Sequence, residues 1–391
     1  MLGSVRQWGT RRRMNRFIPV ILFGALSCAT SGLPETMVII ASQGRGMGCQ
    51  VFQKGLGQPT ARWTSGPLIA DWDSIVSFNP KSGGVIEKGT LRRTNAGTDE
   101  REIVLQIRNL RDGRTTPVLS IEQIASAIPA TKQSEAPNVP RSRFVSSPQM
   151  SPDGKWAVFQ HSRRDTPSVD LWLYDISRRV FVKISDGDRC DETPVWSPDA
   201  TRVAFYRTPL RVGHGWGLTK EPGYALWVWD TRSGKAREIA PPSPHPEWPR
   251  LPAVWSPDGS RILAVWGGSE PEEPLGLCVV DMESGNPLHL TNRTREGASP
   301  SYSFSPDGRL VLYVSADGLH TVQPDGKNNK TVLAGQGFHL AKWNCVGSHI
   351  IFSETRRDRR EWFTVRSDGS DLQPIVPPPG YRIVDVFTYM E

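Results

Sequence analysis

The sequence predicts an all-β fold, a β-propeller of four-stranded antiparallel blades, with seven blades favoured and six as the alternative. The 391 residues include 36 Gly, 33 Pro and 14 Trp, a turn-rich and aromatic-rich composition that suits many short strands. Apolar residues alternate after each copy of a recurring turn motif, and such a repeat indicates a propeller or a solenoid. The copies are Ser151-Pro152-Asp153-Gly154, Ser197-Pro198-Asp199-Ala200, Ser256-Pro257-Asp258-Gly259 and Ser305-Pro306-Asp307-Gly308.

Each copy is predicted to be the first hairpin turn of a blade. Pro fixes φ at the first central position, and Asp bonds its own backbone two residues on. Downstream of the second copy, residues 226–230 predict a third strand, Ser233-Gly234 a second turn, and residues 235–239 a fourth strand. Four antiparallel strands make one blade.

Five such units are visible, and a sixth, weaker copy precedes them at residues 76–113. The five units span residues 144–186, 193–240, 252–292, 299–335 and 339–376.

The two ends of the chain predict one composite blade. Residues 37–42, 49–54 and 60–64 resemble a second, third and fourth strand without a first, whereas residues 382–387 form a lone strand. Pairing the N-terminal and C-terminal strands would close the ring and remove an open sheet edge. If the N-terminal segment packs elsewhere, six blades remain.

The Trp/Phe-Ser-Pro-Asp-Gly units resemble the PD40, or WD40-like, repeats of TolB-like β-propellers. The resemblance implies one propeller over residues 37–391. TolB itself carries an α/β domain before its propeller, whereas residues 37–122 here have blade-like patterns. TolB's partners are therefore not expected to carry over.

The N-terminus predicts export. Residues 1–28 contain five Arg and no acidic residue, so the net charge of +7 falls to +2 without them, and no nucleic-acid partner is expected. Residues 17–26 form a ten-residue apolar run, typical of a secretory signal peptide and too short to span a bilayer. Cys28 resembles a lipobox cysteine, so lipid attachment to the cell envelope and simple cleavage into the periplasm both stay open, as does a start at Met1 or Met14. Residues 29–36 are a short linker.

Export would place Cys49, Cys190, Cys278 and Cys345 in an oxidising compartment, where four cysteines allow three pairings that the sequence does not distinguish. Cys278 lies within an apolar strand-like run, which favours a buried, unreactive residue.

Ligand-binding residues are expected on the face opposite the tight turns, because the longer connections all emerge there. These connections are residues 124–143, 207–224, 240–250, 267–274 and 354–361. The candidates are Asp191, Glu192, His214, Trp216, Trp248, Arg250, Glu296 and His339. The alternatives are that residues 191–194 merely start a strand and that the Arg356–Arg360 run is a solvated loop.

The chain contains no Gly-x-Ser-x-Gly, His-Glu-x-x-His or Cys-x-x-Cys motif. We therefore expect a non-catalytic, monomeric propeller that binds an envelope protein, peptide or glycan, with no cofactor or metal. One alternative is a channel-mouth enzyme, such as the metal-dependent polysaccharide lyases that this architecture resembles, using His214, His245 and His339. Another is a purely structural role in an envelope assembly.

Overall fold

A computed structural model describes most of the region predicted to form blades. The described residues are 35–43, 49–55, 64–69, 74–79, 84–88, 103–109, 114–128, 145–162, 168–185, 189–213, 217–220, 223–243, 251–267, 276–291, 301–356 and 359–390. Within them the chain forms 29 β-strands and one α-helix, which confirms the all-β prediction. The predicted signal peptide, Cys28 and residues 29–34 of the predicted 29–36 linker lie outside the described residues, whereas residues 35 and 36 are not linker but the start of a β-strand.

Five four-stranded sheets account for most of the strands. The first contains, in spatial order, β29 (Arg382–Met390), β1 (Glu35–Ser42), β2 (Cys49–Gly55) and β3 (Thr64–Ile69). The second contains β4 (Ser74–Asn79), β5 (Gly84–Lys88), β6 (Ile103–Asn109) and β7 (Thr115–Ser120). The others are β17 (Val254–Trp255), β18 (Arg261–Trp266), β19 (Gly276–Asp281) and β20 (Pro287–His289); β21 (Tyr302–Phe304), β22 (Val311–Val314), β23 (Gly318–Val322) and β24 (Lys330–Ala334); and β25 (Phe338–Trp343), β26 (His349–Arg356), β27 (Arg359–Arg366) and β28 (Gln373–Pro374).

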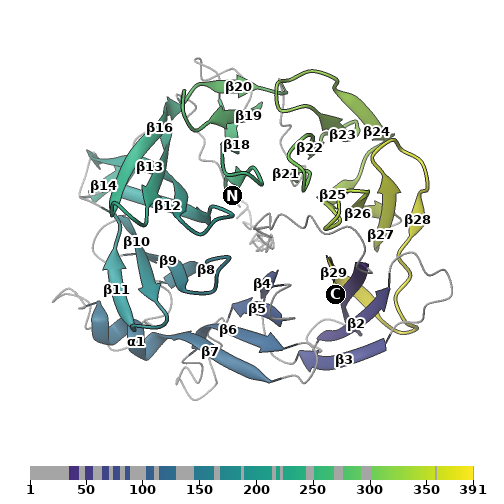
Figure 1. Ribbon diagram of the computed structural model, residues 1–391, viewed down its shortest axis with the longest axis horizontal. Helices are drawn as coiled ribbons and strands as arrows, with labels where there is room; N and C mark the ends of the chain where they lie inside the picture. The colour runs from purple at the N-terminus through teal and green to yellow at the C-terminus, as the bar shows by residue number, and fades with distance from the viewer. Residues whose placement is uncertain are drawn as a thin grey trace, which may run out of the picture.

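The remaining strands form one nine-stranded sheet. Its members are β8 (Val145–Met150), β9 (Trp156–Ser162), β10 (Val169–Asp175), β11 (Val180–Lys183), β12 (Arg189–Trp196), β13 (Arg202–Gly213), β14 (Gly217–Lys220), β15 (Tyr224–Asp230) and β16 (Lys235–Ser243). The parallel pair Val169 and Cys190 joins its two halves. Figure 1 shows all the sheets standing in a ring with β4, β8, β12, β21, β25 and β29 toward its centre. Because two predicted blades share one sheet, the count of seven stays a prediction.

The ring is closed by the two ends of the chain, as predicted. Strand β1 pairs antiparallel with β29, with Val38 opposite Phe387 and Ile39 opposite Val386. Both strands contribute to a buried cluster that includes Met37, Ile39 and Val386 and that reaches Ile351 and Trp362 of the neighbouring sheet. The fourth strand of this sheet, β3, begins at Thr64, where its predicted span ended.

The Ser-Pro-Asp turns are held by one repeated hydrogen-bond pattern. Each Ser hydroxyl donates to the Asp carboxylate two residues on, at 2.5–2.6 Å, and accepts from the backbone amide five residues on, at 2.9–3.0 Å. The same carboxylate oxygen accepts a further backbone amide at 3.0–3.2 Å. These contacts fix each turn without help from the rest of the sheet.

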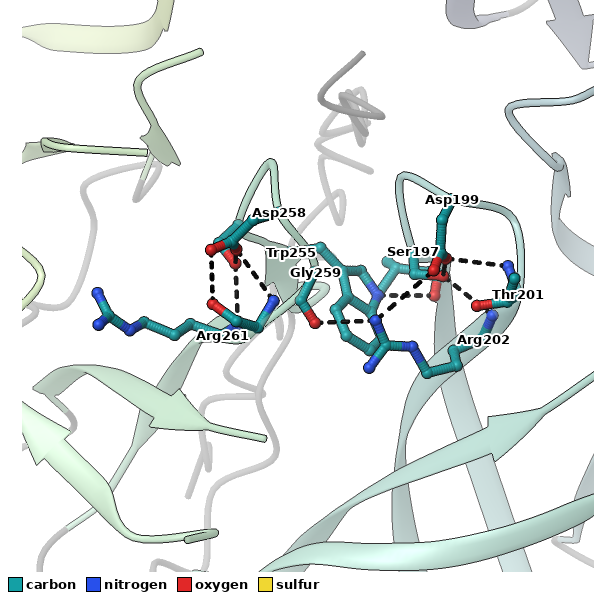
Figure 2. A network of polar contacts seen from close by, with 11 residues as sticks. Ser197, Asp199, Thr201, Arg202, Trp255, Asp258, Gly259 and Arg261 are labelled. Atoms are coloured by element: carbon teal, nitrogen blue, oxygen red, sulfur yellow. Dashed lines mark hydrogen bonds and ion pairs between the residues drawn. The ribbon is translucent and has the colours of Figure 1, made fainter. Parts of the chain in front are cut away.

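One turn also links neighbouring sheets. Arg202 donates from Nη2 to the carbonyl of Gly259 at 2.9 Å and lies over the Trp255 ring at 4.8 Å, as Figure 2 shows. In return, Trp255 Nε1 donates to the carbonyl of Val195 at 3.2 Å. These contacts tie the turn at residues 197–200 to the turn at residues 256–259.

The fifth unit replaces this turn, because Asn344 stands where the other units have Ser. Its Oδ1 accepts the amide of His349 at 2.9 Å, as the Ser hydroxyl does elsewhere. Its Nδ2 donates to Ser348 and, at 2.9 Å, to Glu35 of β1. The departure from the repeat thus ties the fifth unit to the closing sheet.

Four segments differ from the predicted loops. Strand β16 runs to Ser243 in the expected 240–250 loop, and β26 and β27 form a hairpin in the expected 354–361 loop. Helix α1 (Ile121–Ala127) overlaps the start of the expected 124–143 loop, and it forms because Ser120 and Gln123 make a capping box and Ile124 is buried. Strand β13 continues to Gly213 and pairs with β14, so part of the expected 207–224 loop is a hairpin.

The turn aspartates predict a loss of stability in acid. Although burial acts to raise it, hydrogen bonds from Ser256 and Ser260 hold the pKa of Asp258 below its ordinary value. Because the folded-state pKa is depressed, this stability is present above the unfolded pKa of about 3.9 and is lost as pH falls through the folded pKa. We expect Asp258→Asn to lower the urea midpoint at pH 7, with a difference from the parent chain that shrinks between about pH 4 and pH 2. A difference that stays constant to pH 2 would contradict this assignment.

Candidate functional site

The inner strands β4, β8, β12, β25 and β29 all have an irregular register near their start. The pairing shifts between Ser146 and Gln149 in β8, between Glu192 and Val195 in β12, and between Phe338 and Ala341 in β25. A bulge of this kind re-aims the side chains beside it. The starts of the inner strands, opposite the Ser-Pro-Asp turns, therefore present irregular backbone at the predicted binding face.

Two bulge residues have left-handed backbone conformations. Ser147 has φ 49° and Thr193 has φ 52°, and positive φ is unfavourable for a β-branched residue such as Thr193. Among the described residues, the Thr193 hydroxyl is buried without a hydrogen-bond partner. Such strain persists only where the surroundings impose it, and it concentrates at functional sites.

Asp191 lies directly before this bulge and is fully buried. It faces Arg207 across the β12–β13 pair, and the two form a bidentate ion pair of 2.7 and 2.8 Å. The guanidinium, itself buried, lies 4.3 Å from the Trp227 ring centroid and 5.3 Å from that of Phe205. The structure thus places the Asp191 carboxylate inside the fold, where Arg207 neutralises it. This buried ion pair supports the bulge from below.

Glu192 and Thr193 directly follow Asp191 in β12 and are half-buried. Glu192 pairs in register with Tyr206, which is fully buried. Of the two acidic candidates that the structure describes, Asp191 and Glu192, only Glu192 therefore retains exposure at the face.

His339 lies in the corresponding bulge of β25. Its ring is half-buried, and Nε2 lies 2.7 Å from the Thr355 hydroxyl of β26. Burial lowers the pKa of His339, and the positive charge of Arg360 lowers it further. The imidazole is therefore held neutral over a wider pH range than an ordinary histidine.

The other candidates lie outside the described residues. These are His214, Trp216, Trp248, Arg250 and Glu296, together with His245 from the enzyme alternative. Asp191 and His339 belong to different sheets, which Figure 1 shows on opposite sides of the ring. Their joint action in one site stays a prediction.

Sequence analysis missed the strained bulge residues and the role of Thr355. A signal for the first was present: Ser147-Pro148 and Thr193-Pro194 stand at the same distance before their Ser-Pro-Asp motifs. No sequence signal pairs His339 with Thr355, because the contact crosses two strands.

Three further observations concern cysteine chemistry, metal binding and membrane-spanning helices. Cys278 is fully buried, as expected, and burial raises the pKa of its thiol to about 12. Within the described ranges, no group of three or more His, Cys, Asp or Glu side chains is arranged to hold a metal ion. Nor does any helix there have the length and apolar character to cross a membrane.

Comparisons with known proteins support the fold class. No family model matches the chain. An uncharacterised peptidase YuxL of Bacillus subtilis is 25% identical over 208 residues, and dipeptidyl-peptidase 5 of Aspergillus fumigatus is 23% identical over 211 residues. These matches cover 43% and 50% of this chain but only 29% and 27% of the relatives, so the chain matches under a third of their length.

Solved structures give the same class. An oligogalacturonate lyase in complex with manganese has a TM-score of 0.51 at 12% identity, covering 76% of this chain and 74% of the lyase. Dipeptidyl peptidase 4 of Porphyromonas gingivalis has a TM-score of 0.50 at 11% identity, covering 86% of this chain and 52% of that protein. TolB of Acinetobacter baumannii is also similar, with a TM-score of 0.43 at 14% identity over 96% of this chain and 88% of TolB. The chain is a β-propeller.

Proposed function

We propose that this chain is an exported, non-catalytic β-propeller that binds a protein, peptide or glycan of the cell envelope at the starts of its inner strands. The observation that carries the proposal is the recurrent bulge in β8, β12 and β25, which leaves Glu192 and His339 half-buried on a rigid base. Irregular backbone held on a stiff scaffold is where binding residues concentrate.

The chemistry of three described groups favours binding over catalysis. Arg207 neutralises Asp191, so that carboxylate is not available as a general base. The Cys278 thiol remains protonated at neutral pH because its pKa is about 12. His339 is hydrogen-bonded to the Thr355 hydroxyl, which orients the ring.

Site-specific photo-crosslinking tests this proposal. A photoreactive amino acid at Glu192 should give a defined covalent adduct in cell-envelope extracts, whereas the same amino acid at Val180, half-exposed on the outer strand β11, should not. Equal labelling from both positions, or none from Glu192, would contradict binding at the inner-strand starts.

A channel-mouth enzyme is the second candidate, because the relatives and solved structures described above include peptidases and a lyase in complex with manganese. We would incubate the purified chain with oligogalacturonate and Mn²⁺, and separately with fluorogenic dipeptide substrates. Turnover that follows the protein through purification would replace the binding proposal with an enzymatic one.

We further propose export through residues 1–28, either with acylation of Cys28 or with simple cleavage. Labelling with a radioactive fatty acid separates these forms. Incorporation that disappears in Cys28→Ser supports the lipid anchor, and a mature chain without label supports cleavage into the periplasm.

A further inference from the structure

The hairpin of β26 and β27 places different charges on its two faces. In register, Thr355 pairs with Arg360 and Arg356 pairs with Arg359. Because successive side chains of a strand point to opposite faces, Arg360 shares a face with Thr355, whereas Arg359 shares the other with Arg356. His339 belongs to the first face, since its ring is hydrogen-bonded to Thr355 at 2.7 Å.

The two faces also differ in net charge, because Glu354 and Glu361 share the second face with Arg356 and Arg359 and match their two positive charges. On the second face, Arg356 forms an ion pair with Glu354 at 2.8 Å and lies over the Phe363 ring at 4.5 Å. Among the described residues, Arg360 forms no ion pair, and its side chain is exposed. Within the described part of the hairpin, the first face therefore presents one unbalanced guanidinium beside a hydroxyl and an imidazole.

We propose that Arg360, Thr355 and His339 form a binding site for a carboxylate of an acidic peptide. This inference rests on the proposed binding function and names the ligand class for one part of the face. A guanidinium matches a carboxylate in shape and can donate two parallel hydrogen bonds. One unbalanced positive charge beside a neutral imidazole suits a monoanionic carboxylate better than a dianionic phosphate.

The surrounding aromatic residues favour a peptide over a sugar acid. Phe338, Trp362 and Phe363, the large rings of this corner, are all buried. None of these rings offers a free face on which a sugar could stack. An acidic peptide requires no such platform.

A bound carboxylate would act directly on His339. Arg360 contributes to the lowered pKa of this imidazole, and a bound anion would offset that charge. We therefore expect saturating acetyl-(Glu)₄-amide to raise the pKa of His339, measured by NMR of the histidine rings and assigned by the signal missing in His339→Gln. The peptide acetyl-(Gln)₄-amide should leave it unchanged.

The hairpin supplies a matched pair of variants. Arg360→Gln should weaken binding of the glutamate peptide by about tenfold, because it removes a charge-assisted contact. Arg359→Gln removes the same charge from the adjacent residue on the opposite face and should leave the affinity within about twofold. Circular dichroism and the urea midpoint of both variants would verify that each is folded.

Each outcome decides the inference. An equal loss in Arg359→Gln and Arg360→Gln would show long-range attraction only, and absence of peptide binding would overturn the site. Preferential binding of trigalacturonate, with the same dependence on Arg360, would overturn the peptide assignment. If the site fails while crosslinking from Glu192 persists, the proposed function stands without this inference; if crosslinking fails too, both are wrong.

Discussion

Replacing Lys342 with Met is expected to lower the free energy of unfolding by about 3–5 kcal/mol. Lys342 of β25 and Asp385 of β29 form an ion pair of 2.8 Å between the last unit and the closing sheet. Both residues are buried, and Lys342 Nζ also lies 4.3 Å from the Phe387 ring centroid. The large effect follows because the variant leaves the Asp385 carboxylate in the interior without the ammonium that balances it.

Urea denaturation followed by tryptophan fluorescence would measure this loss. The matched control is Lys155→Met, which breaks an ion pair with Asp153. Because the Lys155 side chain is 73% exposed, this variant should lower the free energy of unfolding by under about 1 kcal/mol. The double variant Lys342→Met/Asp385→Leu should regain much of the stability, because no charge then remains buried. A loss in Lys342→Met as small as in the control would show that the pair is not desolvated.

Arg207→Met is the second substitution with a large expected effect, again about 3–5 kcal/mol. It removes the guanidinium that neutralises Asp191 and that lies against Trp227. Because Asp191 directly precedes the strained bulge of β12, the loss should extend to the binding face. Crosslinking from Glu192 should therefore fall even under conditions in which the variant remains folded.

The matched control for this prediction is Arg309→Met, since Arg309 is 86% exposed and lies 3.9 Å from Asp307. It should change the free energy of unfolding by under about 1 kcal/mol. In Arg207→Met/Asp191→Asn the buried charge is removed, and we expect partial recovery of stability. If Arg207→Met alone were as stable as the parent chain, Asp191 would have to be balanced by another group.

The fold was predictable because its signals are local and repeated. The Ser-Pro-Asp motif specifies its own hydrogen bonds within a few residues. The contacts that Ser197 and Asp199 form in one copy therefore recur in the other copies. The ends of the chain were informative for a related reason: each lacked strands that the other supplied. Helix α1 was not predicted, because a pattern of seven residues is too short to distinguish a helix from a loop.

The candidate site was less predictable because its contacts are not local. Asp191 has a charged side chain of the kind that binds ligands, but it is buried against Arg207, which lies in the next strand. The sequence shows both residues but not that their side chains face one another. Likewise, the distinction between Arg359 and Arg360 depends on the register of β26 and β27, which a run of arginines does not reveal.

The pairing of β1 with β29 would allow the strands to follow one another along the chain from a different starting point. Glu35 and Met390 are partners across this pair, so the described chain ends beside where it begins. A circularly permuted protein, with these ends joined by a short linker and new termini opened between two neighbouring units, would retain every sheet described above. The ring therefore has no structurally required first strand.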